Sequence, residues 1–236
     1  MRHLLSLVAA AGFAAFASAQ DAVTLHSVTW RADDTVAVVY SKNFATCAHM
    51  RFGNATCSQT GVMTHTQNLF CTQGTNVIVV VPTSAFVAGF DVGDTVYMVH
   101  GNNSGVASPC VPVGYDGAYG PGCVGSNGVP SLTTNGDAPL AGSAVAFTIA
   151  NGVPASIAVL GFATDQVAVP VIGCTLLIFP VLGVVSVPFD AAGSGTFVFP
   201  TPPSAVGVQF AVQAFALDPA GPQGFSATVG REIRVR

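Results

Sequence analysis

Charged side chains are scarce in this 236-residue sequence: Asp, Glu, Lys and Arg make up 8% of it, and Lys42 is its single lysine. A protein that binds nucleic acid or anionic lipid needs a stripe of basic residues, and none is available here. The net charge of −4 is small and spread along the chain, so it offers no long-range attraction to a charged partner. We therefore expect no nucleic-acid partner.

The sequence also lacks a helical hydrophobic stripe and, after its N-terminus, an uninterrupted membrane-spanning run. The most apolar stretch, "VAVPVIGCTLLIFPVLGVVSV", is broken by Pro170, Gly173, Pro180 and Gly183. Its many β-branched residues favour consecutive strands instead. We expect no transmembrane span in the mature chain.

The first residues have the pattern of a secretory signal. Arg2 precedes an apolar run from Leu4 to about Phe16, and Ala17-Ser18-Ala19 is a small-x-small sequence of the kind that a signal peptidase cuts. The run is too short to span a bilayer comfortably. The sequence therefore predicts a signal peptide over 1–19 and a mature chain that is secreted or held at the cell surface.

Residues 20–115 alternate short strand patterns with turns. Seven candidate strands, from "VTLHSVTW" to "SPCVPV", predict an immunoglobulin- or fibronectin-III-like sandwich. Tyr97 follows a Gly-Asp-Thr turn and resembles the tyrosine corner of such sandwiches. If Tyr97 faces the core, alternation turns Met98 and His100 outwards, so His100 would lie near His49 on an outer sheet face.

A glycine- and proline-rich seam over 116–130 leads to a second β-pattern over 131–236. Pro or Gly punctuates nearly every junction between its candidate strands. An antiparallel sandwich of the jelly-roll kind is the expected result, although the strand order is not readable from the pattern. The chain as a whole is predicted to be all-β, with two sandwich domains.

Several landmarks of the second half occur together in a known kind of domain. They are "GPGCVGSNGVPSL", "GCTL" at Gly173–Leu176, "VQFAVQAFALD" and the closing "GREIRV". Over roughly residues 119–236 the chain resembles a recurrent C-terminal β-domain of secreted proteins from planctomycetes and similar bacteria. The resemblance implies secretion, a β-sandwich and a disulfide between Cys123 and Cys174, and it implies no reaction.

The even number of cysteines in an exported chain predicts three disulfides, because no Cys-x-x-C pair suggests a metal or redox site. With the second-domain pair assigned by resemblance, three pairings stay open in the first domain. Folding the strands around Cys47 and Cys71 as a hairpin favours that pair. It leaves Cys57 for Cys110.

The spacing G-x-G-x-x-G occurs in "GPGCVG", at Gly120, Gly122 and Gly125. A dinucleotide loop would need a preceding strand and a following helix, whereas turn-forming residues surround this stretch on both sides. We interpret these glycines as turn residues and expect no cofactor.

Catalytic patterns are weak. No G-x-S-x-G elbow occurs, and the histidines of the mature chain all belong to the first domain. A secreted hydrolase, the third hypothesis, would have to combine one of them with Asp33, Asp34, Asp91 or Asp94. A metal site would use His49 and His100 with His65 or a carboxylate. Glu232, the single glutamate, lies between Arg231 and Arg234 and is expected to form a surface ion pair.

The leading hypothesis is an exported, non-enzymatic module with an adhesive or structural role at the cell surface. Its partners would be surface polysaccharides, other surface proteins or further copies of itself, since β-edges need covering. The alternative is a carbohydrate-binding module that uses aromatic and amide side chains. The candidate residues are Trp30, Asn102, Asn103, Tyr115 and Tyr119.

Overall fold

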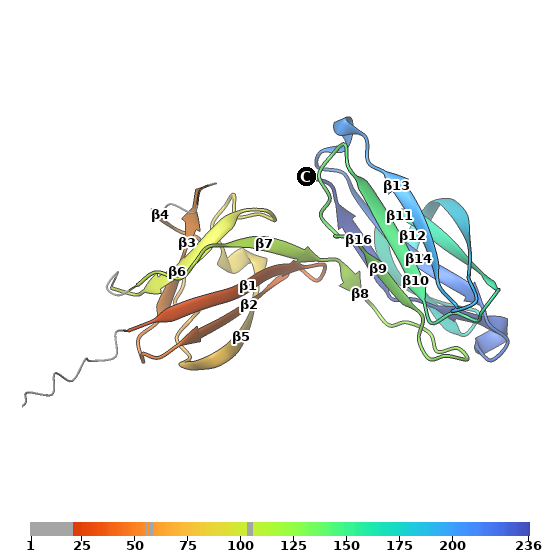
Figure 1. The fold of residues 1–236 in the computed structure, drawn as a ribbon, viewed down its shortest axis with the longest axis horizontal. Helices are drawn as coiled ribbons and strands as arrows, with labels where there is room; N and C mark the ends of the chain where they lie inside the picture. Colours follow the sequence, from red (N-terminus) through yellow and green to blue (C-terminus); the bar gives the residue numbers. More distant parts are fainter. Residues whose placement is uncertain (1–20, 55, 57–58, 103–105) are drawn as a thin grey trace, which may run out of the picture.

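The structure is a computed structural model that describes residues 21–54, 56, 59–102 and 106–236. The predicted signal peptide, Cys57 and Asn103 lie outside the described residues. Sixteen β-strands and three short 3-10 helices make up the regular structure of the described part, which confirms the all-β class. Figure 1 shows these strands in two lobes that meet where β7 leads into β8.

The N-terminal lobe contains seven strands and one 3-10 helix. Its elements are β1 (Val23–Arg31), β2 (Thr35–Lys42), β3 (Ala48–Gly53), β4 (Gln59–Met63), β5 (Gly74–Pro82), η1 (Thr83–Ala85), β6 (Thr95–His100) and β7 (Val111–Asp116). The strand order is β4-β3-β6-β7-β1-β2-β5. The first residues of β7 pair antiparallel with β6 and its last four pair parallel with β1, so β7 joins two layers. This arrangement agrees with the immunoglobulin- or fibronectin-III-like prediction.

Alternation along β2 shows how the sequence builds this core. Val36, Val38 and Tyr40 are fully buried, while the residues between them are only half-buried. They belong to one apolar cluster with Met50 of β3 and Met98 of β6. Successive side chains on a strand point to opposite faces, so this period of two means that one face of β2 packs against the core.

The face assignment of β6 is corrected by the structure. The β3–β6 register places Met50 opposite Met98, and Met98 lies in the core cluster. Tyr97 is buried as well, but it alternates with Met98 and is not part of that cluster. Because both residues are buried, the alternation of polar and apolar residues cannot show which face of β6 is turned to the core cluster. The expectation that Tyr97 and not Met98 faces this core was wrong.

The C-terminal lobe is an antiparallel sandwich of two layers. Its elements are β8 (Ala118–Tyr119), β9 (Ser131–Thr134), β10 (Ala144–Ala150), β11 (Ile157–Val171), β12 (Cys174–Pro188), β13 (Gly195–Pro200), η2 (Pro203–Ala205), β14 (Gln209–Leu217), η3 (Pro222–Gly224), β15 (Phe225–Ala227) and β16 (Gly230–Arg234). One sheet has the order β13-β10-β9 and the other β12-β11-β14-β16-β8, with β15 on β14. The two sheets enclose a separate core that includes Phe147, Leu160 and Ile233.

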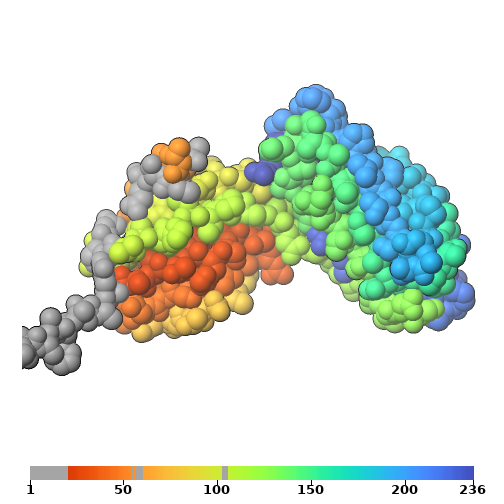
Figure 2. Space-filling view, in the orientation of Figure 1, coloured from red at the N-terminus to blue at the C-terminus, as the bar shows by residue number. Residues whose placement is uncertain are grey.

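The predicted seam is partly regular structure. Within it, β8 pairs with β16 and belongs to the C-terminal lobe, so Gly117 is the one residue between the last strand of one lobe and the first of the next. A Cβ at Gly117 would lie 1.9 Å from the carbonyl oxygen of Glu232, which leaves no room for a side chain. Glycine therefore allows the two lobes to meet directly, as the space-filling view shows (Figure 2).

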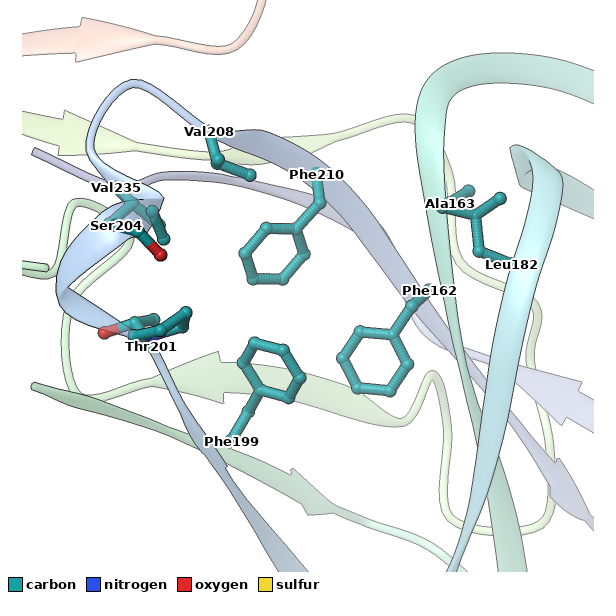
Figure 3. A pocket seen from close by; sticks show the side chains of 11 residues that line it. Phe162, Ala163, Leu182, Phe199, Thr201, Ser204, Val208, Phe210 and Val235 are labelled. Carbon is teal, nitrogen blue, oxygen red and sulfur yellow. The ribbon is translucent and has the colours of Figure 1, made fainter. Parts of the chain in front are cut away.

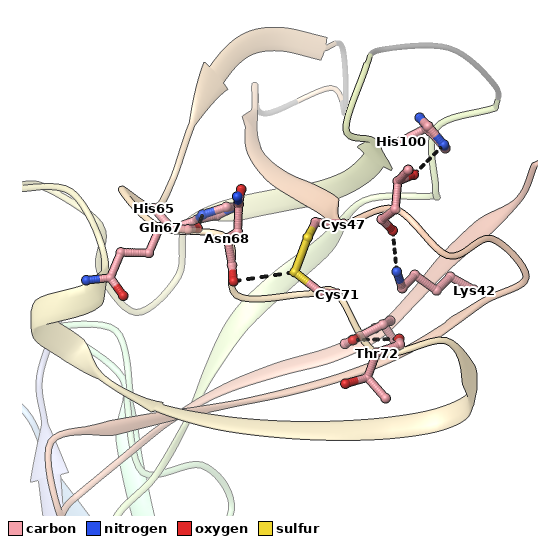
Figure 4. Close-up of a disulfide and its surroundings, with 10 residues drawn as sticks. Lys42, Cys47, His65, Gln67, Asn68, Cys71, Thr72 and His100 are labelled. Carbon is pink, nitrogen blue, oxygen red and sulfur yellow. Dashed lines mark hydrogen bonds between the residues drawn. A yellow bond between two sulfur atoms is a disulfide. The ribbon is translucent and has the colours of Figure 1, made fainter.

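Two predicted disulfides are present. Cys47 pairs with Cys71 in the N-terminal lobe (Figure 4), and Cys123 pairs with Cys174 in the C-terminal lobe. The second bond ties the seam to the start of β12. The pairing of Cys57 with Cys110 stays a prediction, because Cys57 lies outside the described residues.

We predict that replacing Cys123 and Cys174 together by alanine lowers the free energy of unfolding by about 2–4 kcal/mol, because the bond closes a long loop. Urea unfolding followed by fluorescence measures this. Val124→Ala is the matched control, since Val124 is the exposed neighbour of Cys123. A double variant as stable as the control variant would contradict the prediction.

Candidate functional site

His65 has a structural role in the N-terminal lobe. It is buried, its Nε2 accepts a hydrogen bond from the backbone N–H of Met50 at 3.2 Å, and its Nδ1 donates to the carbonyl of Gln67 at 2.5 Å. Since Nε2 must accept, the proton is on Nδ1 and the ring is neutral. Burial lowers the pKa of this imidazole. His65 cannot bind a metal ion without giving up one of these bonds.

His49 and His100 do not lie side by side on one face. Ala48 lies opposite His100 in the register, and His49 lies opposite Val99, so the two imidazoles project from opposite faces of the sheet. His100 is buried, whereas His49 is only half-buried. The prediction that His49 and His100 are neighbours on one face is therefore wrong. It would require a β3–β6 register shifted by one residue, with His49 directly opposite His100.

His100 nevertheless has polar neighbours. Its Nε2 lies 2.8 Å from the hydroxyl of Thr46 and 3.4 Å from the carboxylate of Asp21, and its Nδ1 is hydrogen-bonded to the side-chain oxygen of Asn102. A hydroxyl, an imidazole and an orienting group are the components of a nucleophilic site. Here, however, the hydroxyl and the carboxylate both lie next to Nε2, so the carboxylate does not orient the ring from the opposite nitrogen.

The carboxylates proposed for a hydrolase do not converge on a histidine. Asp33 accepts hydrogen bonds from the hydroxyl and the backbone N–H of Thr35, and the hydroxyl is the main cause of its lowered pKa. Asp94 accepts from the backbone N–H of Asp91 within one turn. These contacts are those of Asp in β-turns.

Lys42 is also structural. Although it is a strand residue with a long cationic side chain, it is buried, and its ammonium donates to the carbonyl of Thr46. The ammonium lies 4.8 Å from the centroid of the Phe44 ring, and burial lowers its pKa. Figure 4 shows Lys42 and His100 beside the Cys47–Cys71 disulfide.

In the part of the chain that the structure describes, no group of three His, Cys, Asp or Glu side chains could hold a metal ion. Nor does any helix there have the length and apolar character needed to cross a membrane.

The three aromatic candidates for carbohydrate binding are only half-buried, and none of them is exposed. Trp30 and Tyr115 lie together, since the guanidinium of Arg234 is 5.5 Å from the indole ring and 5.1 Å from the phenol ring. Tyr119 is placed separately and donates to the carbonyl of Leu177 at 3.0 Å. Burial raises the pKa of both tyrosines. The structure thus brings Trp30 and Tyr115 together, with the guanidinium of Arg234 over both rings.

Glu232 is the centre of this junction between the lobes. Its Oε1 accepts from the hydroxyl of Tyr115 in β7 at 2.5 Å and from Nε of Arg234 at 3.0 Å, and its Oε2 accepts from Gln166 at 2.5 Å. Only 15% of its side chain is exposed. The predicted ion pair with an arginine is confirmed, but it lies between the lobes and not on the open surface.

A second polar contact reinforces the same junction. The Asp137 side chain is buried, bonds Arg231, and accepts from the backbone N–H of Gly117 at 2.8 Å. Arg231 also lies 3.7 Å from Asp116 of the N-terminal lobe. Asp116 and Asp137 are distant in the sequence from Arg231, so no local pattern predicts these contacts. The sequence shows only that charged residues are clustered near the C-terminus.

The C-terminal lobe contains a pocket that the sequence did not indicate. It has a volume of about 420 Å³ and opens between the two sheets (Figure 3). The rings of Phe162, Phe199 and Phe210 come from β11, β13 and β14 and converge on it, with Leu182 of β12 at one side. No side chain that lines it is charged. The arrangement can hold an apolar group and contains no pair of titratable residues for acid–base chemistry.

The comparisons with known proteins identify no family. No family model and no curated protein matches the chain. Among solved structures, it is similar to trypsin-activated alpha-2-macroglobulin from Escherichia coli, with 12% identity and a TM-score of 0.30 over 92% of this chain. This chain spans only 16% of that protein's length.

Two other solved structures are similar at the same level. The chicken interferon gamma receptor alpha chain has 8% identity and a TM-score of 0.27, over 90% of this chain and 97% of that one. A 1.5-MDa bacterial ice-binding adhesin has 12% identity and a TM-score of 0.27, over 92% of this chain and 66% of that one. At these scores the similarities carry no argument about function.

We predict that the free energy of unfolding decreases as the pH falls below about 6.5, the ordinary pKa of histidine. The pKa of His65 is lowered in the folded state, so the unfolded chain binds the proton first and acid favours unfolding. His65→Gln should make the dependence between pH 7.5 and pH 5 shallower, as measured by urea titrations. His26→Gln, at an exposed histidine, is the control. Equal slopes for both variants and the parent chain would contradict the assignment.

Proposed function

We propose that this protein is an exported, non-enzymatic β-module that acts at the cell surface, where its two lobes form one stiff adhesive or structural element. Two disulfides support an extracellular environment, since such bonds persist in oxidising compartments. The observation that carries the proposal is the junction around Glu232. Its charged groups, unlike those of an active site, bond one another and the backbone across the two lobes.

A stiff element needs a junction that resists bending. Two lobes joined by a flexible linker move independently, whereas here one residue separates β7 from β8. Bending would have to break the Tyr115–Glu232 hydrogen bond and expose the half-buried carboxylate. A buried charge that loses its partners is costly, so the junction favours one orientation of the lobes.

Non-enzymatic function is supported by how the candidate catalytic groups are used. His65 is held neutral by two backbone groups, and the carboxylate of Asp33 accepts hydrogen bonds from Thr35 within its own turn. The large pocket has no titratable lining. Surface polysaccharides, other surface proteins and further copies of the chain are the partners that such a module would engage.

We predict that Arg234→Met loosens the junction. It removes the guanidinium that bonds Glu232 and covers Trp30 and Tyr115, and it leaves the carboxylate with fewer partners. Small-angle X-ray scattering should show a larger radius of gyration, and stability should fall by about 1–3 kcal/mol.

The matched control is Arg31→Met, which makes the same chemical change at an exposed ion pair with Asp33, where the contribution to stability is small. It should leave both the scattering curve and the stability close to those of the parent chain. A parent chain that already scatters as two independently moving lobes would refute the stiff element.

We further predict that antibodies label the protein on intact cells that produce it, and that the purified chain does not hydrolyse generic ester or glycoside substrates. His100→Gln provides the decisive comparison, because His100 has a hydroxyl, a carboxylate and an amide as neighbours. Turnover by the parent chain that disappears in this variant would establish a hydrolase and overturn the proposal.

A further inference from the structure

The pocket of the C-terminal lobe lies between two edge strands. β12 is the outermost strand of the larger sheet and β13 is the outermost strand of the smaller one. Among the described residues, no further strand closes this side of the sandwich. Leu182 of β12 and Phe199 of β13 both line the opening (Figure 3). The pocket therefore connects the interior of the sandwich with the solvent.

A local irregularity in β12 keeps the opening clear. Phe162 pairs with Gly183 and Ala163 pairs with Val181, so Leu182 is an additional residue that bulges from the ladder. Leu182 is 69% exposed. Gly183 pairs with Phe162, so a side chain at this position would project on the same face of the sheet as the Phe162 ring. A Cβ there would meet no atom within 4 Å.

The rings that line the pocket are arranged at angles to one another. The centroids of Phe162 and Phe199 are 5.6 Å apart with their planes at 31°, and those of Phe199 and Phe210 are 5.6 Å apart with their planes at 55°. The three rings therefore contact one another and form one continuous aromatic wall. A flat aromatic molecule lying against this wall would meet ring faces and ring edges, the contacts that aromatic groups prefer. An aliphatic chain would gain only the burial of its surface.

Polarity and size restrict the occupant further. No lining residue carries a charge, so a charged group would lose its hydration without compensation. The single proton of the Thr201 hydroxyl is used within the protein, since its oxygen lies 2.7 Å from the carbonyl of Ser143 and 3.2 Å from that of Leu140. Ser204 is exposed at the rim. The volume lies within the roughly 300–1,000 Å³ typical of small-molecule sites.

We propose that this pocket binds a neutral aromatic small molecule of one or two fused rings, which packs against the wall formed by Phe162, Phe199 and Phe210. The inference concerns the C-terminal lobe alone and is independent of the stiff junction in the proposed function. The ligand enters between Leu182 and the η2 segment, past Gly183.

The test uses N-phenyl-1-naphthylamine, a neutral naphthalene whose fluorescence rises in apolar surroundings, with the full mature chain. We expect saturable binding at one site per chain, displaced by naphthalene and not by n-decanol. Gly183→Leu should fill the pocket from the β12 side and weaken binding at least about tenfold. Ala205→Leu should fill it from the η2 side with the same result.

Val198→Leu is the matched control, because Val198 precedes Phe199 on β13 but is exposed on the opposite face. It adds the same type of side chain outside the pocket and should leave binding unchanged. Near-UV circular dichroism establishes whether each variant is folded. If one of the two blocking variants does not fold, the other still tests the proposal.

Three results would overturn the proposal. Equal dye binding by the parent chain and both folded blocking variants would place the dye elsewhere on the surface. Displacement by n-decanol as effective as by naphthalene would mean a general apolar site without aromatic preference. Concentration-dependent dimerisation that excludes the dye, detected by size-exclusion chromatography, would assign the pocket to a second copy of the chain.

Discussion

The carboxylate of Glu232 accepts hydrogen bonds from Tyr115 of the N-terminal lobe and from Gln166 and Arg234 of the C-terminal lobe, where little water can replace them. The chain has few charges, and several are concentrated here. A charge at a partly buried site is stabilised only when each of its oxygens has a partner. The direct passage of the chain through Gly117 brings the lobes close enough to provide those partners. In the proposed function, this network and the Asp137–Arg231 contact beside it hold the two lobes in one orientation.

The same scarcity of charge shapes the two sandwiches. Exposed apolar residues remain on the strands, among them Phe179, Leu182 and Val184 of β12. Such an edge is normally a risk for aggregation. Here the bulge at Leu182 interrupts the regular edge. The irregular edge borders the pocket, because Leu182 is also one of its lining residues.

Several features followed from local patterns. The period of two along β2 and the turn residues predicted the all-β class. Folding the strands around Cys47 and Cys71 as a hairpin favoured that pair among three possible pairings, and the bond is present. The resemblance of the C-terminal half to a known β-domain implied the Cys123–Cys174 bond, which is present. The prediction that His100 points outwards was wrong. Tyr97 and Met98 are both buried, so the hydrophobicity of these two residues could not show which face of β6 is turned to the core.

The sequence by itself determined the strand-forming character, the disulfide framework in part and the absence of a basic surface, because each depends on residue types or on short spacings. Only the tertiary structure decided the junction and the pocket. Tyr115 and Glu232 are 117 residues apart, and the three phenylalanines of the pocket come from three strands in two sheets. Strand order and register bring such residues together, and both are set by long-range packing that no local pattern encodes.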